Sequence, residues 1–168
     1  MQSIESQLKS VLGSGACVIG VGNRLRGDDG IGSRVAGQVA PRVAAAVVDG
    51  GVAPENHLEK IARMRPETVV VIDAADFGGR PGEMRFVAAA DAKGGGLSTH
   101  AVSLDLFARY LEQRAGSRVF LVAVQAVSAG WEESMSAPVA AAAERLVDLL
   151  VQCLPGSVPD LQQKERSW

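Results

Sequence analysis

The sequence contains little that would connect it to a membrane, to nucleic acid or to a secretory route. It has no apolar run close to the roughly 18 residues that a membrane span requires. Its formal net charge of -2 provides no basic surface of the kind that binds nucleic acid. The chain does not open with a basic segment followed by an apolar stretch. We therefore expect no nucleic-acid partner, no membrane insertion and no signal peptide.

Cysteines and aromatic residues are also scarce. The two cysteines, Cys17 and Cys153, lie far apart and form no CxxC motif. This favours two reduced, buried thiols in a cytoplasmic protein over a disulfide or a zinc ribbon. Aromatic residues make up only 4% of the chain, so small and β-branched side chains must fill its core. We expect one domain over residues 1–168, with its core at about 16–154 and a loose tail at 155–168.

Apolar runs typical of buried strands alternate with segments of helical spacing, which predicts a mostly parallel, twisted sheet between two layers of helices. The expected class is α/β, a three-layer α/β/α sandwich with strand order near 2-1-3-5 and the fourth strand as an antiparallel edge. The expected strands are 16–21, 43–48, 68–72, 83–87 and 118–124. The expected helices are 29–39, 54–64, 100–114 and 136–154, with an optional helix within 1–14 and a mobile loop at 92–99.

The stretch from Val18 to Gly32 organises the chain. It is a strand, then a turn with glycines at 20 and 22, then a helix start that carries Asp28 and Asp29. Open α/β sheets place their sites at such a turn, at the carboxyl ends of the strands.

Further acids and a histidine are expected at the same edge. Asp73 and Asp76 follow the third predicted strand, and His100 precedes a helix. Carboxylates and an imidazole that converge there would suit zinc, nickel, manganese or iron better than calcium. The plainer alternative is that the first two acids cap a helix, that Asp73 marks a strand end and that His100 has no special role.

Two other enzyme classes fit less well. A dinucleotide site would use Gly20, Gly22 and Asp49, but Leu25 stands at the third glycine position and the carboxylates would repel a pyrophosphate. Nucleophilic hydrolysis by a serine is the other class. The sequence has no GxSxG motif, and the serines at 98, 103 and 128 have no evident base except His100.

The motifs Gly20-Val-Gly22-Asn23 and Gly27-Asp28-Asp29-Gly30 resemble the opening motif of the hydrogenase maturation endopeptidases. Segments 48–56, 65–66, 71–76, 81–83 and 98–100 resemble motifs of the branch that serves the hydrogenase of formate hydrogenlyase. The similarity covers about residues 16–153. It implies a three-layer fold and an endopeptidase that removes the C-terminal extension of a nickel–iron hydrogenase large subunit after nickel insertion.

The resemblance also implies the site. Carried over by motif, the catalytic and metal-binding residues are Asp29, Asp73 and His100, and Asp28 matches the acid before the first ligand. The partner is the large-subunit precursor, which presents the nickel; another divalent metal is possible in the isolated protein. The metal either polarises the scissile carbonyl or is sensed in the substrate, with Asp28 or Asp73 as general base. The alternative function is a nickel-sensing chaperone that does not cut.

The sequence departs from the family pattern near its fifth predicted strand. Gln125 is followed by Ala126 where the resemblance predicts proline, and Trp131 and Glu132-Glu133 differ from the expected aromatic loop. These departures concern the substrate-docking surface and not the proposed ligands.

Overall fold

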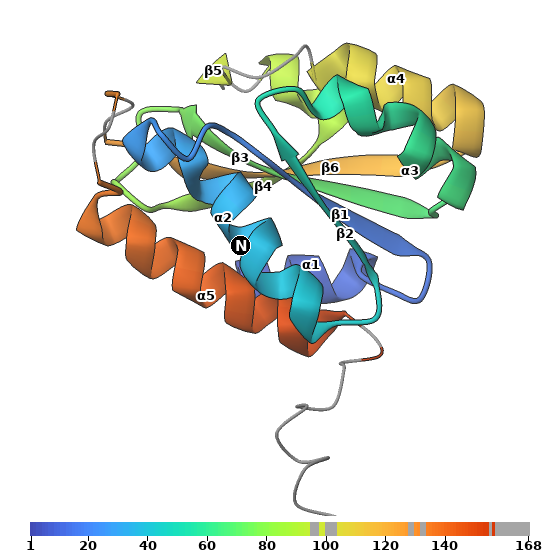
Figure 1. Cartoon of the computed structure of the whole chain (residues 1–168), viewed down its shortest axis with the longest axis horizontal. Helices are drawn as coiled ribbons and strands as arrows, with labels where there is room; N and C mark the ends of the chain where they lie inside the picture. Colours follow the sequence, from blue (N-terminus) through green and yellow to red (C-terminus); the bar gives the residue numbers. More distant parts are fainter. Residues whose placement is uncertain (95–97, 100–103, 128–129, 132–133, 155, 157–168) are drawn as a thin grey trace, which may run out of the picture.

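The computed structural model describes residues 1–94, 98–99, 104–127, 130–131, 134–154 and 156. A sheet lies between two layers of helices in the predicted α/β/α arrangement (Figure 1). One face is covered by α1 (Ile4–Val11), α2 (Ile31–Val39) and α5 (Ala137–Cys153), and the other by α3 (Leu58–Met64) and α4 (Leu104–Ala115). Among these residues, no helix combines the length and the apolar character that crossing a bilayer would take.

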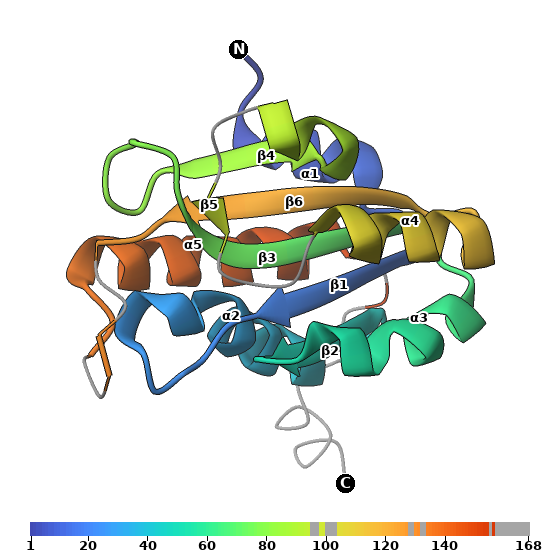
Figure 2. The same cartoon turned by 90° about the horizontal axis from the view of Figure 1, so that it is seen from above.

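The strands lie side by side in the order β2-β1-β3-β6-β4, which can be followed across the molecule in Figure 2. This order confirms the predicted one. Its parallel strands are β1 (Ala16–Val21), β2 (Ala46–Gly51), β3 (Thr68–Asp76) and β6 (Arg118–Gln125). The predicted antiparallel edge is β4 (Met84–Ala88), which pairs with β6. A short strand, β5 (Ser98–Thr99), pairs antiparallel with the end of β3.

The alternation of side chains along β3 divides the core in two. Val70 and Ile72 belong to the core under α1, α2 and α5, whereas Val69 and Val71 belong to the core under α3 and α4. A strand buried on both faces is typical of a parallel sheet with helices on each side. Asp73 is in step with Val69 and Val71, so its side chain points to the α3–α4 face.

The optional N-terminal helix is present as α1. Ser3 caps it, because the Ser3 hydroxyl accepts a hydrogen bond from the Ser6 backbone N–H at 3.1 Å. Ile4 and Leu8 on its inner side are buried in the core that α5 also covers. The two thiols are free as expected, with Cys17 buried and Cys153 half-buried.

Three strand boundaries were predicted wrongly by three residues or more. The second strand runs from Ala46 to Gly51 and not from 43 to 48, because its pairing with β1 begins at Ala46, opposite Cys17, and ends at Gly51, opposite Val21. The third strand continues past Ile72 to Asp76, because β6 pairs with it as far as Gln125. Asp73 therefore lies within a strand and not after one.

Several predicted helices begin with or follow short 3-10 turns. These are η1 (Gly27–Gly30), η2 (Ala40–Arg42) and η3 (Pro54–His57). Part of the segment predicted as a loop at 92–99 is regular instead, because the 3-10 turn η4 (Ala89–Gly94) enters it and β5 lies within it. The helix expected from residue 29 starts at Ile31, and the one expected from 54 becomes α-helical at Leu58. Residues 95–97 of the predicted loop, residues 100–103 before α4, and the predicted tail except Gly156 lie outside the described residues.

Candidate functional site

The glycines of the β1–α2 connection let η1 sit directly on the ends of two strands. Gly22 has a φ of 138°, and a Cβ atom there would lie 1.8 Å from the Asp29 carbonyl oxygen. A Cβ atom at Gly32 would lie 2.1 Å from the carbonyl oxygen of Ile72 on β3. No other residue type fits at this packing distance. The glycines thus bring η1, with its two aspartates, against the carboxyl end of β3.

Asp29 is held by its own connection. Its Oδ2 accepts a hydrogen bond of 2.9 Å from the Asn23 backbone N–H. The Asn23 side chain in turn accepts a 2.9 Å bond from the Leu25 N–H, which closes a local turn. The Asp29 side chain is half-buried, so it faces the sheet edge without being sealed from ligands.

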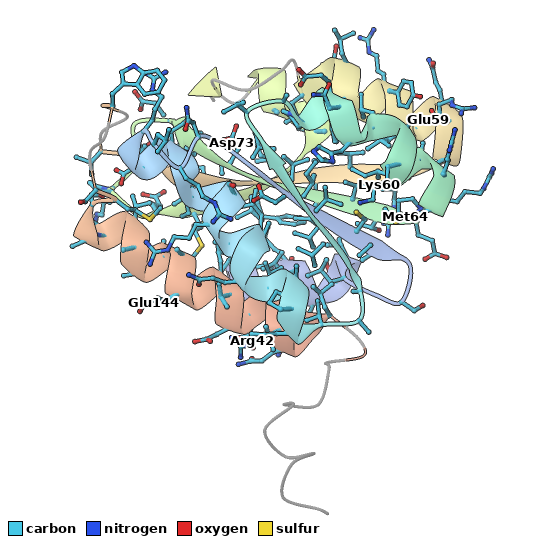
Figure 3. All side chains as sticks on the ribbon, viewed as in Figure 1. Arg42, Glu59, Lys60, Met64, Asp73 and Glu144 are labelled. Carbon is cyan, nitrogen blue, oxygen red and sulfur yellow. The ribbon has the colours of Figure 1, made fainter. Side chains whose placement is uncertain are left out.

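Asp73 is the second carboxylate of the site and lies near the carboxyl end of β3 (Figure 3). Its exposed fraction is only 3%. Burial raises the pKa of the Asp73 carboxyl well above its ordinary value, and the nearby Asp29 carboxylate raises it further. The Ala74 backbone N–H opposes this by stabilising the charged form. Asp29 is carried by η1, which packs against β3, so the two carboxylates belong to the same end of the sheet.

This carboxylate pair suits a divalent cation. Within the described part of the chain, no lysine, arginine or histidine forms an ion pair with Asp29 or Asp73. A buried carboxylate beside a second carboxylate is costly unless a cation or a proton compensates it. No group of three or more potential ligands occurs among the described residues, so the pair alone is an incomplete ligand set.

The third predicted ligand, His100, lies outside the described residues. The residue before it in the sequence, Thr99, pairs with Ala75 on β3, two positions from Asp73. The short strand β5 therefore lies beside the end of β3, the strand that carries Asp73.

Asp28 differs sharply from its neighbour. It is 1% exposed, and its two oxygens accept hydrogen bonds from the Val127 N–H, the Ser136 N–H and the Ser136 hydroxyl. Its role in the described structure is to join η1 to the β6–α5 connection. Asp76 also serves a turn, because its Oδ1 accepts bonds from the Gly78 N–H and the Gln125 side-chain amide.

Gln125 is a structural residue of this edge that the sequence analysis did not single out for this role. Its Oε1 accepts bonds from the backbone N–H groups of Phe77 and Gly79, at 2.9 and 3.1 Å, which fixes the loop after β3. The neighbouring Ala126 donates its N–H to the Ala75 carbonyl oxygen. A proline could not make that bond. A buried amide at a strand end was the signal that could have pointed to Gln125.

Asp49, considered above as a ribose-binding acid, has a different role. Its carboxylate accepts a 2.6 Å bond from the Ser33 hydroxyl and pairs with Arg24 at 3.0 Å. Arg24 also donates to the Ser33 hydroxyl and carbonyl oxygens. These contacts connect the ends of β1 and β2 with α2, so the Asp49 carboxylate is engaged in a structural network.

Comparison with known proteins gives a consistent result. A model of the family described as HycI, hydrogenase maturation protease, matches residues 31–153. The hydrogenase 3 maturation protease of Escherichia coli strain K12 is 35% identical over 133 residues, which cover 77% of this chain and 85% of that protein. The crystal structure of the NiFe hydrogenase maturation protease HycI from Thermococcus kodakarensis KOD1 matches with a TM-score of 0.82 at 33% identity, covering 89% of this chain and 99% of that one. A crystal structure of the hydrogenase 3 maturation protease matches with a TM-score of 0.70 at 31% identity, over 83% and 89% of the two chains.

The fold and these similarities define the class of the protein: it is an endopeptidase of hydrogenase maturation. Within that class, the chain belongs to the HycI family of hydrogenase maturation proteases, whose model covers well over half of its length. The resemblance noted in the sequence is thereby confirmed, as is the branch to which it pointed.

Proposed function

We propose that this protease removes the C-terminal extension of a nickel–iron hydrogenase large-subunit precursor once nickel has been inserted, and that Asp29, Asp73 and His100 meet that nickel. The observation that carries the proposal is the buried Asp73 carboxylate beside Asp29, with no cationic side chain paired to either among the described residues. Nickel arrives as part of the substrate, and another divalent ion takes its place in the isolated protein.

The two aspartates have distinct parts in this proposal. Asp29 is anchored through the Asn23 N–H and offers its second oxygen to the ion. Asp73, whose carboxylate is buried at the site, exchanges a proton with the water that attacks the peptide bond. Asp28 is a poorer base, because both of its oxygens already accept hydrogen bonds. The bound cation supplies polarisation of the scissile carbonyl.

His100 would add the nitrogen ligand. Two carboxylates and one imidazole leave coordination positions open, so an ion held by the precursor can complete its shell here. Recognition of nickel and cutting would then depend on the same residues. The catalytic unit that we propose spans about residues 16–154 of a single 1–168 domain, acts in the cytoplasm, and uses neither nucleic acid nor membrane insertion.

The test is mass spectrometry of the large-subunit precursor before and after incubation with the protein. We expect the wild type to shorten the nickel-loaded precursor and to leave the nickel-free precursor and an isolated junction peptide intact. Asp29→Asn and His100→Ala should fold with near-wild-type melting temperature and fail to cut, whereas Asp148→Asn, on the exposed side of α5, should cut normally.

Each other outcome has a definite meaning. Equal cleavage of nickel-free precursor would contradict recognition of nickel in the substrate and favour a metal held by the protease. A precursor that binds but keeps its mass would contradict cleavage and favour the chaperone function.

A further inference from the structure

Asp28 joins three segments that are distant in the sequence. Its Oδ1 accepts a 2.7 Å bond from the Ser136 N–H, and its Oδ2 accepts bonds of 2.8 Å from the Val127 N–H and 2.9 Å from the Ser136 hydroxyl. Val127 and Ser136 stand at the two ends of the connection between β6 and α5. One buried carboxylate therefore holds both ends of that connection against η1.

A carboxylate is the group that this junction requires. Hydrogen bonds to an ionised oxygen are about twice as strong as neutral ones, and Val127 and Ser136 together donate three such bonds to Asp28. Ser136 is also the residue that precedes the first turn of α5, so the negative charge lies at a helix N-terminus. These contacts fix the position of the connection relative to η1, which also carries Asp29.

The connection carries exposed apolar side chains next to η1 and the residues that precede it. Val127 is 58% exposed and Trp131 is 65% exposed, and Leu25 of the β1–α2 connection is 64% exposed. The guanidinium carbon of Arg26 lies 4.9 Å from the centre of a Trp131 ring, a cation–π contact that joins the two connections. We call Leu25, Val127 and Trp131 the apolar ledge.

We propose that Asp28 is a positioning residue for the substrate: it holds the apolar ledge in register with Asp29, and the ledge receives the apolar stretch of precursor polypeptide beside the cleaved bond. This inference rests on the proposed function, since a polypeptide must lie across this edge for its bond to reach Asp29 and Asp73. Large exposed apolar side chains on both connections that flank Asp29 offer such a chain a surface to bury. Asp28 touches neither the ion nor the reacting bond.

The test measures KM and kcat for the nickel-loaded precursor with wild type, Asp28→Asn, Trp131→Ala and the double variant. Asparagine keeps the size of Asp28, but its amide nitrogen must face one of the N–H donors. We expect KM to rise about tenfold, the effect of losing roughly 1.4 kcal/mol of binding, while kcat changes less than about threefold. Zinc affinity, measured by calorimetry, should stay at the wild-type value.

Two comparisons separate positioning from a merely structural role. If Asp28 acts through the ledge, Trp131→Ala should raise KM alone but add little to Asp28→Asn, so the two effects should not add. Ser136→Ala is the graded control, because it removes the hydroxyl bond and keeps both backbone bonds. Its KM should lie between those of wild type and Asp28→Asn.

Three results would overturn the inference. These are an unchanged KM in Asp28→Asn with only a lower melting temperature, additive effects in the double variant, or loss of zinc binding in Asp28→Asn. If the wild type cuts no precursor, the proposed function fails, but the role of the apolar ledge can still be tested. Interferometry then compares the affinity of wild type and of Asp28→Asn for the uncut precursor. Equal affinities in that arm would overturn it.

Discussion

The amino ends of the parallel strands form one end of the sheet, the amino-end edge, and their carboxyl ends form the other, the carboxyl-end edge. The two contain different buried polar groups. At the amino-end edge these are the neutral hydroxyls of Thr68 and Ser117, and Ser117 donates a 2.6 Å bond to the Pro66 carbonyl oxygen. At the carboxyl-end edge, Asp28 and Asp73 are buried. A hydrogen-bonded hydroxyl is buried at little cost, whereas a carboxylate is not. The amino-end edge thus contributes stability, and the carboxyl-end edge keeps in Asp73 a buried acid that forms no ion pair with a cationic side chain among the described residues.

The largest effect should come from replacing Asp73 with asparagine, which breaks the charged edge without changing its shape. We expect processing of the precursor to fall by at least about 100-fold, because an ion-binding and proton-accepting group is lost. The protein should fold, since the substitution removes a buried charge. Timed mass spectrometry of the precursor checks the activity and thermal unfolding checks the fold. Activity above about a tenth of the wild type would contradict the role of Asp73.

The pH dependence of stability should sharpen the same contrast. Burial and the Asp29 carboxylate raise the pKa of Asp73 in the folded state, so its favourable contribution is present below the unfolded pKa of about 3.9 and is lost as pH rises through the raised folded value. The free energy of unfolding of wild type should therefore fall relative to Asp73→Asn as pH increases. Urea unfolding of metal-free protein over a pH series measures this. Asp148→Asn, on the exposed side of α5, is the control. A difference in unfolding free energy between wild type and Asp73→Asn that does not change with pH would contradict a buried charge at Asp73.

At the amino-end edge, Ser117→Ala should affect stability alone. It removes the bond to the Pro66 carbonyl oxygen, which costs about 1 kcal/mol of unfolding free energy. Processing by the variant should equal that of wild type at a temperature where both are folded. A loss of activity beyond the loss of folded protein would mean that the two edges are not separate in function.

The smallest effect should come from Arg24→Lys at the carboxyl-end edge. The ion pair between Arg24 and Asp49 is about half exposed, so its loss should cost less than about 1 kcal/mol. Lysine keeps the charge but loses the forked contacts to Ser33. Chemical denaturation measures the change. A cost of several kcal/mol would show that this network is part of the core of the fold.

The sequence was sufficient to predict the layers, the strand order and the antiparallel edge, because the apolar runs of β1, β3 and β6 are long and regular. It was less reliable at strand ends, where pairing with neighbours decides the boundary: β2 starts only where β1 can pair with it, and β3 continues as far as β6 supports it. Local patterns contain no information about such partners.

The site shows the same division. Asp29 and Asp73 were singled out from their place near strand ends and from the motifs, and the structure places them on η1 and β3, two elements in contact. The structural contacts of Asp28 were not predictable, because they are made with residues about 100 positions away in the sequence. The structural role of Gln125 was not predicted either, since its hydrogen-bond partners belong to the loop after β3, which is distant in the sequence.

The most direct test of the metal site is anomalous diffraction from crystals of the full chain soaked in zinc or nickel salt. The account predicts a peak shared by Asp29 and Asp73, with carboxylate oxygens of both at about 2.0–2.2 Å from the ion and His100 as the nitrogen ligand. Crystals of Asp73→Asn should lose the peak. An ion bound by Asp28, or a peak that stays in the Asp73→Asn crystals, would contradict the assignment of this carboxylate pair.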